Sequence, residues 1–232
     1  YITHMTCREA IAEIEKAKRT GQRVSGETCT HYLTTTKEVL DNPDFNEAAK
    51  FVCSPALRDR EDCEALWQAL SDGLLTAVSS DHCGIDLAEL KQAGRNDFTQ
   101  IPNGSPGAGD RLHMVWTEGV CTGKLTRQKF VDVIATQPAK INGIYPRKGT
   151  LAVGSDADVV IFDPNYEGTV HLADNPNGVD YNLYEGRRQS GRVETVLLRG
   201  QVVVENAKFV GRYGQGKFIP ANMYASGYEN RN

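Results

Sequence analysis

The strongest constraint on the fold is an alternation of strand-like and helix-like segments over about the first 145 residues. Residues 74–80 are apolar on both faces, as in a buried parallel strand, whereas residues 7–19 space their apolar side chains three and four positions apart, as in a surface helix. A second helix is predicted over residues 60–71, where Gly73 would end it. Because a closed (β/α)8 barrel takes about 250 residues and only three strand-helix units fit here, we expect an α/β fold that is part of a TIM barrel.

The pattern changes near residue 149, which divides the chain into three parts. Residues 1–148 would form the partial barrel, residues 149–210 a β-sandwich segment, and residues 211–232 an extended C-terminal tail. Strands are predicted at residues 51–54 in the barrel part and at 151–154, 157–162 and 193–205 in the β segment. Turns are expected at residues 154–155, 163–164 and 199–200.

Composition excludes several classes of protein. The net charge of -4 provides no basic field, so neither nucleic acid nor an anionic membrane surface is an expected partner. No apolar run approaches the roughly 18 residues of a membrane span, and no secretory signal is recognisable. The six cysteines form no CxxC pair, which favours reduced thiols and a cytoplasmic protein. Walker, GxGxxG, GxSxG and HExxH motifs are absent from the sequence.

Two residues at strand ends are candidate metal ligands. His4 closes the first apolar run, and Asp81 follows the strand at residues 74–80. A TIM barrel collects its chemistry at the carboxyl ends of its strands, where an imidazole and a carboxylate would meet. The alternatives are a structural histidine and an aspartate that caps a helix or bonds within a loop. Two ligands are also too few for catalytic zinc, which usually takes three protein ligands, so we expect further ligands outside this chain.

Two loops are candidates for binding a flat polar ligand. Residues 101–107 combine two prolines with two glycines, and residues 53–58 fix the backbone of Ser54 by the proline that follows it. Such loops can direct main-chain N–H and C=O groups at a ligand that carries amide edges of its own. A rigid connector is the alternative for each loop. The spacing of His31, His82 and His113 assigns no role to any of them.

Taken together, these motifs resemble the dihydropyrimidinase and D-hydantoinase family of the amidohydrolase superfamily. The motifs are ITHMT (2–6), GETCTHYL (26–33), SPALR (54–58), SDHC (80–83), IPNGSPG (101–107), PAK (138–140) and GSDADVV (154–160). The resemblance runs over nearly all of the chain, and it is most specific in the SPALR, SDHC and IPNGSPG motifs.

The resemblance implies an eight-stranded barrel with two zinc or manganese ions and a β-sandwich built from both ends of the polypeptide. His4 would close the sixth strand and bind the second metal. Asp81 would close the eighth strand, bind the first metal and act as the general base and acid, taking the proton of the attacking hydroxide and delivering it to the leaving amide nitrogen. The backbones of Ser54 and Asn103 would hold the amide groups of the ring.

The resemblance also implies what lies outside the chain. The family's HxH pair, its fifth-strand histidine and the carboxylated lysine that bridges the two metals would precede Tyr1, so the chain would be the C-terminal half of the enzyme. The expected partners are this N-terminal half, a small cyclic amide substrate and further copies in a homotetramer, and the chain alone should be inactive. Alternatives are a non-enzymatic dihydropyrimidinase-like scaffold, or another cyclic amidohydrolase such as an allantoinase.

Overall fold

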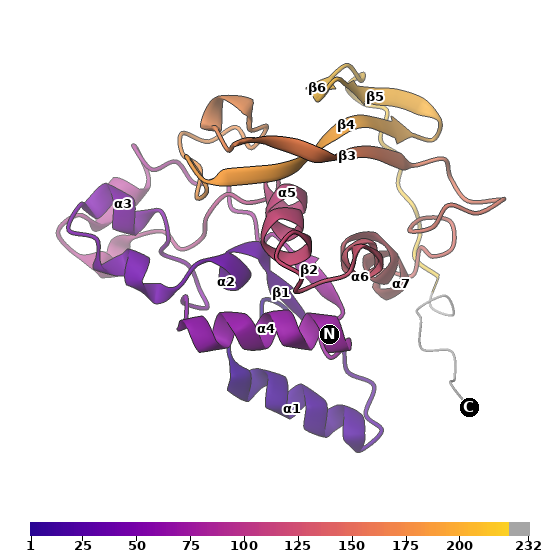
Figure 1. Ribbon diagram of the computed structural model, residues 1–232. Coiled ribbons are helices and arrows are strands. Elements are labelled where there is room, and N and C mark those ends of the chain that lie inside the picture. The colour runs from indigo at the N-terminus through magenta and orange to yellow at the C-terminus, as the bar shows by residue number, and fades with distance from the viewer. Residues whose placement is uncertain (223–232) are drawn as a thin grey trace.

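The computed structural model describes residues 1–222, which form a helix-rich part and an antiparallel sheet (Figure 1). The α-helices are α1 (Arg8–Arg19), α2 (Thr30–Thr34), α3 (Phe45–Ala49), α4 (Arg60–Asp72), α5 (Arg111–Val115), α6 (Arg127–Val131) and α7 (Gln137–Ile141). The strands are β1 (Glu27–Cys29), β2 (Ala77–Ser79), β3 (Val159–Thr169), β4 (Arg188–Leu198), β5 (Gln201–Glu205) and β6 (Lys208–Phe209). Turns of 3-10 helix occur at Lys37–Asp41, Lys91–Gly94, Phe98–Gln100 and Leu172–Asp174, and the π-helical turns Trp116–Val120 and Asp132–Thr136 continue α5 and α6.

Three parallel segments form the barrel part of the fold. β1 pairs with β2, with Thr28 opposite Val78. On the other side of β1, the Ile2 N–H donates to the Ser25 carbonyl at 2.8 Å, and the Glu27 N–H donates to the Ile2 carbonyl at 3.0 Å. The segment at Ile2 is therefore a third parallel neighbour, as the sequence predicted. Because all three run in the same direction, their carboxyl ends meet at one edge.

Helices α1 and α4 pack beside these strands, and Figure 1 shows α5, α6 and α7 on the side that faces the antiparallel sheet. The predicted helix at residues 60–71 is confirmed as α4, and Gly73 ends it in the left-handed conformation, with φ 78°. α1 buries Ile11 and Ile14. Gly26 allows this close packing, because an added Cβ would lie 2.5 Å from the Ile14 Cδ1 atom.

The antiparallel sheet has the strand order β3-β4-β5-β6. The predicted turn at residues 199–200 is confirmed as a two-residue hairpin, since Arg199 and Gly200 both have positive φ, 49° and 78°. The sheet packs on the helices through Phe162, whose ring lies 4.9 Å from that of Trp116. One four-stranded sheet is thus present in residues 1–222, and the second layer of a sandwich is not among them.

Three local predictions were wrong. Residues 51–54 are not a strand: they form the end of the turn after α3 and an irregular segment that leads to Pro55. Residues 151–154 form a turn whose side chains are exposed. The expected turn at residues 163–164 is instead part of β3, where a register shift between Asp163 and Glu167 accommodates Pro164.

The C-terminal segment is described only in part. Residues 211–222 contain neither helix nor strand, and the rest of the predicted tail lies outside the described residues. Among the helices in residues 1–222, none is long and apolar enough to cross a membrane.

Candidate functional site

His4 and Asp81 lie at the carboxyl ends of the two outer parallel segments. His4 follows Ile2, Asp81 follows β2, and β1 lies between them. Neighbouring strands are about 4.8 Å apart, so two strand spacings separate the two backbones by about 10 Å. Two metal ions about 3.5 to 4 Å apart fit across such a gap, with one ligand reaching in from each side. The structure therefore brings both predicted ligands to one edge.

The backbones at these two positions are strained. His4 has φ 39° and Asp81 has φ 46°, which is the left-handed region that L-residues with a side chain seldom adopt. The remaining non-glycine residues with positive φ in residues 1–222 belong to the tight turns of the antiparallel sheet: Arg199, Asn206 and Ala207. In the barrel part, such strain thus occurs at the two candidate ligands and at no other described non-glycine residue. Strain of this kind collects at functional sites because the surrounding fold must hold it in place.

The side chains of both residues are available to bind a ligand. Each is half-buried. Within residues 1–222, the Asp81 carboxylate takes part in no hydrogen bond or ion pair, and the one hydrogen-bond contact of the His4 ring is from Nε2 to Thr3 Oγ1, at 3.3 Å. A half-buried carboxylate without a partner is costly, and a divalent cation would satisfy it. The donor set therefore fits the expected metals.

No complete metal site is present in the described part of the chain. Nowhere in residues 1–222 do three His, Cys, Asp or Glu side chains come together in a group able to hold a metal ion. Catalytic zinc usually has three protein ligands. The two candidate ligands, His4 and Asp81, are therefore fewer than catalytic zinc usually takes.

The groups between the two ligands are held neutral. Burial, and to a lesser extent the neighbouring imidazole of His4, together lower the pKa of His31 to about 4. Burial also raises the pKa of the Cys29 thiol to about 12, with the Asp81 charge acting in the same direction and a hydrogen bond from Ser79 opposing it. At neutral pH, His4 and Asp81 therefore face an uncharged imidazole and an uncharged thiol.

The two candidate binding loops are tied to each other. The Gly104 N–H, next to Asn103, donates to the Val52 carbonyl at 3.0 Å, two residues before Ser54. The side chains of Ser54 and Asn103 are both exposed. Gly104 is required for this contact: its φ is 119°, and an added Cβ would lie 2.4 Å from the Cys83 sulfur.

The same loops are joined to the strand end that carries Asp81. The Cys83 N–H donates to the Ser105 carbonyl at 3.0 Å, and the Gly107 N–H donates to His82 Nδ1 at 3.3 Å. His82 thus accepts a backbone hydrogen bond that holds the loop. The structure therefore brings Ser54, Asn103 and Asp81 to one connected region of loops.

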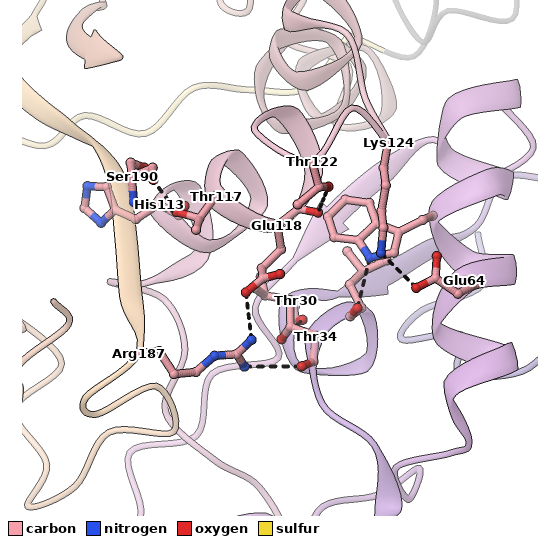
Figure 2. Close-up of polar contacts among 12 residues, drawn as sticks. Thr30, Thr34, Glu64, His113, Thr117, Glu118, Thr122, Lys124, Arg187 and Ser190 are labelled. Atoms are coloured by element: carbon pink, nitrogen blue, oxygen red, sulfur yellow. Dashed lines mark hydrogen bonds and ion pairs between the residues drawn. The ribbon is translucent and has the colours of Figure 1, made fainter. Parts of the chain in front are cut away.

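His113 lies elsewhere, where the helices meet the antiparallel sheet. Figure 2 shows it near Thr117 and Ser190, and burial lowers its pKa. In the same region Arg187 donates to the Glu118 carboxylate at 2.8 Å and to the Thr34 carbonyl at 3.2 Å. These contacts join the sheet to the barrel part, and His113 is half-buried beside them.

Two buried residues near the site were assigned no role from the sequence. His31 is 4% exposed, and its Nε2 atom has no hydrogen-bond partner among the described residues. Lys91 is fully buried within the long loop after β2. A lysine in a polar loop is normally solvated, so no sequence signal marked its burial.

Parallel strands covered by helices define the class of the protein as part of an α/β barrel. A histidine and an aspartate, two residue types that can bind metals, lie at the shared carboxyl edge of its strands. The chain belongs to the amidohydrolase family, because the model of that family matches residues 2–203. The similar solved structures are hydantoinase-type TIM barrels, which confirms the barrel class of the fold.

Individual relatives agree with the resemblance in the motifs. The D-hydantoinase of Ralstonia pickettii is 47% identical over 224 residues, 97% of this chain and 49% of that protein. The dihydropyrimidinase of Arabidopsis thaliana is 38% identical over 219 residues, 94% of this chain and 41% of that protein. The crystal structure of dihydropyrimidinase from Brevibacillus agri NCHU1002 has a TM-score of 0.89 at 45% identity, covering 91% of this chain and 46% of that one. The chain spans about half the length of the curated relatives it matches.

Proposed function

We propose that the complete protein is a metal-dependent cyclic amidase that opens a dihydropyrimidine or a 5-substituted hydantoin to an N-carbamoyl amino acid. The observation that carries this proposal is the meeting of His4 and Asp81, both with left-handed backbones, at one edge of three parallel strands. The names of the relatives, D-hydantoinase and dihydropyrimidinase, support the substrate class.

The chain would be the C-terminal half of that enzyme. Its parallel segments would be the sixth, seventh and eighth barrel strands, with His4 binding the second metal and Asp81 the first. The other ligands, including a carboxylated lysine between the two zinc or manganese ions, would come from the N-terminal half. This division is supported by the number of candidate ligands, which is fewer than catalytic zinc usually takes, and by the coverage of about half of each relative. Alone, the chain should be inactive.

When bound, the metal ions would supply Lewis acidity and lower the pKa of water to about 7. Asp81 would then act on protons: its carboxylate would accept one from the attacking water and pass it to the leaving amide nitrogen. Its lack of other partners in the described chain leaves the carboxylate free for both steps.

Ser54 and Asn103 would orient the ring. A planar amide presents one donor and one acceptor edge, which backbone C=O and N–H groups can match. The hydrogen bond between Gly104 and Val52 supports this role, because it fixes the spacing of the loops that carry the two residues. Fixed groups of this kind raise the reaction rate by holding the substrate in the reactive geometry.

The remaining features are also proposed for the complete protein. The N-terminal half would supply the second layer of a β-sandwich over β3–β6, the tail would take part in a homotetramer, and the enzyme would act in the cytoplasm. The exposed apolar side chains of the sheet, such as Ile161 and Val202, support a covering layer.

The test is metal analysis together with hydrolysis by the complete protein. We expect about two zinc or manganese ions per chain, as in two-metal hydrolases, and ring opening of dihydrouracil or a hydantoin. No metal and no hydrolysis would instead support the scaffold alternative. Metal together with cleavage of allantoin, and of neither expected ring, would support the allantoinase alternative.

A further inference from the structure

Lys91 is the one lysine among the described residues that is completely buried, with 0% of its surface exposed. It lies in the 3-10 turn Lys91–Gly94, within the long loop between β2 and α5. Its one hydrogen bond from the ammonium group runs from Nζ to the Val52 carbonyl, at 3.2 Å. Within residues 1–222, no carboxylate forms an ion pair with it.

The Val52 carbonyl is the point where the two candidate binding loops meet. It accepts the Gly104 N–H at 3.0 Å as well as the Lys91 ammonium group. A carbonyl oxygen has two lone pairs, so both bonds can form together. Val52 lies two residues before Ser54, and Gly104 directly follows Asn103. Lys91 therefore holds the atom that joins the backbones proposed to bind the ring.

The turn that carries Lys91 is itself anchored. The Asp180 carboxylate accepts the Leu87 and Ala88 N–H groups at 2.7 and 2.8 Å, and the Lys91 N–H donates to the Asp86 carbonyl at 3.2 Å. The backbone of this loop is thus fixed at its base. The ammonium group reaches Val52 from a rigid support.

Stability alone does not explain a buried lysine of this kind. Moving an ammonium ion out of water costs several kcal/mol, and one bond to a neutral carbonyl does not offset that cost. Burial accordingly lowers its pKa, and the charges of Cys53 and Cys83 oppose this, for a net value of about 8. A group that the fold retains at a cost in stability is expected to contribute to function.

We propose that Lys91 is a positioning residue for cyclic amide binding, which holds the Ser54 and Asn103 loops at a fixed separation through the Val52 carbonyl. This inference rests on the proposed function. Lys91 does not contact the reacting atoms; it determines where the two amide-binding backbones lie. Its loss should therefore weaken the binding of the ring much more than it slows the chemical step.

The test is Lys91→Met in the complete, metal-loaded enzyme, because methionine keeps the length of the side chain and removes the charge. We expect KM for dihydrouracil or the preferred hydantoin to rise about tenfold, equal to about 1.4 kcal/mol, while kcat changes by less than about threefold. The melting temperature should stay equal or rise, since the cost of the buried charge is removed. Metal content should not change.

Hydrogen exchange measures the same contact without any turnover. The Gly104 amide should exchange about tenfold faster in Lys91→Met, because the carbonyl that it bonds is no longer braced. Lys16→Met, on an exposed face of α1, is the matched control and should change neither KM nor this exchange. An unchanged KM in Lys91→Met would overturn the proposal, and so would unchanged Gly104 exchange. A lower melting temperature with equal losses in kcat and kcat/KM would also overturn it.

The two levels of the proposal fail separately. If the wild-type complete protein opens neither ring, the proposed function is wrong, yet faster Gly104 exchange in Lys91→Met would still support the bracing of the loops by Lys91. If the wild-type protein is active and Lys91→Met leaves KM unchanged, the role of Lys91 is wrong and the proposed function stands.

Discussion

The barrel part and the antiparallel sheet differ in how completely they bury their apolar side chains. In the barrel part, Leu66, Leu70 and Val78 are at most 1% exposed and belong to one large core. In the sheet, Ile161 is 53% exposed and Val202 is 45% exposed. Phe162 packs against the helices, so its neighbour Ile161 points to the opposite face.

The contrast shows that the barrel part buries its apolar side chains within the chain, whereas one face of the sheet leaves them exposed. The barrel part buries a large core among its own segments, and the same packing brings His4 and Asp81 to one edge. The sheet is supported on one face only, and its other face carries Ile161 and Val202, with cross-strand neighbours in register: Thr195 with Ile161, and Leu197 with Val202. A face of this composition needs a covering layer, which we propose comes from the N-terminal half.

The largest expected effect is on kcat, from a substitution at the carboxyl edge of the barrel part; a similar substitution beside the sheet should have none. Asp81→Asn in the complete enzyme should lower kcat by about 10²- to 10⁴-fold, because an amide cannot take up and return a proton as the carboxylate does. Steady-state hydrolysis with metal analysis measures this. Asp174→Asn, at an exposed position in the 3-10 turn Leu172–Asp174, is the control and should behave as wild type. Equal activity of Asp81→Asn and wild type would remove Asp81 from the mechanism.

The second prediction concerns the core of the barrel part. Trp67 is 2% exposed, and its indole N–H donates to the Leu33 carbonyl at 3.0 Å. Trp67→Ala should lower the free energy of unfolding by about 3 to 5 kcal/mol, through lost contacts and the cavity left behind. Urea denaturation of the complete protein measures the change, with the milder Trp67→Phe for comparison. A loss below about 1 kcal/mol would show that the core of the barrel part does not dominate stability.

Lys91 predicts a dependence of stability on pH. Its pKa is lowered from 10.5 to about 8 in the folded state by burial, so the unfolded chain binds more protons between these two values. Stability should therefore rise with pH across this window and lose that gain as the pH falls through about 8. Burial also raises the pKa of the facing Cys53 thiol, so Cys53 adds its own dependence on pH. The quantity to measure is therefore the difference in urea midpoint between wild type and Lys91→Met. A difference that does not vary with pH would contradict the lowered pKa.

The open face of the sheet gives the fourth prediction. In the complete protein, Ile161→Thr should lower the free energy of unfolding by about 1 to 2 kcal/mol if another layer buries this side chain. Val131→Thr is the matched control, because Val131 is 54% exposed on α6 in the barrel part and should change stability by less than about 0.5 kcal/mol. Equal, small effects at both positions would mean that the face of the sheet stays open.

The smallest effect is expected at the contact between the two regions. Arg187 is one-third exposed and binds both the Glu118 carboxylate and the Thr34 carbonyl (Figure 2). Arg187→Lys keeps the charge and loses the two-pronged geometry, so we expect a loss of about 1 kcal/mol in the free energy of unfolding. Arg188→Lys, whose partner Glu167 lies within the sheet, is the control and should cost less. Equal losses would indicate that Arg187 does not join the two regions.

The elements with strong local signals were predictable from the sequence. The spacing of apolar residues gave α1 and α4, and Gly73 marked the end of α4, because burial of one helix face and a left-handed end leave a local pattern. The predictions at residues 51–54 and 151–154 failed because short apolar runs near prolines and glycines fit turns as well as strands.

The candidate site was predictable only in part. His4 and Asp81 were identified because each ends an apolar run, where a parallel fold places its chemistry. Lys91 and His31 were not, since their burial depends on segments far away in the chain. The Val52 carbonyl, for example, accepts a hydrogen bond from Lys91, which lies 39 residues further along the chain. No local pattern records such a contact.

The sequence by itself determined the long amphipathic helices, the hairpin turn at residues 199–200 and the residue types at the ends of the parallel strands. Periodic burial and chain reversal are local properties, which is why a local pattern records them. Only the tertiary structure decided that Gly104 and Lys91 meet at Val52, that His4 and Asp81 flank β1 with left-handed backbones, and that one face of the sheet is exposed. These features depend on hydrogen bonds and packing between distant segments, whose free energy is realised only once the parallel strands have aligned.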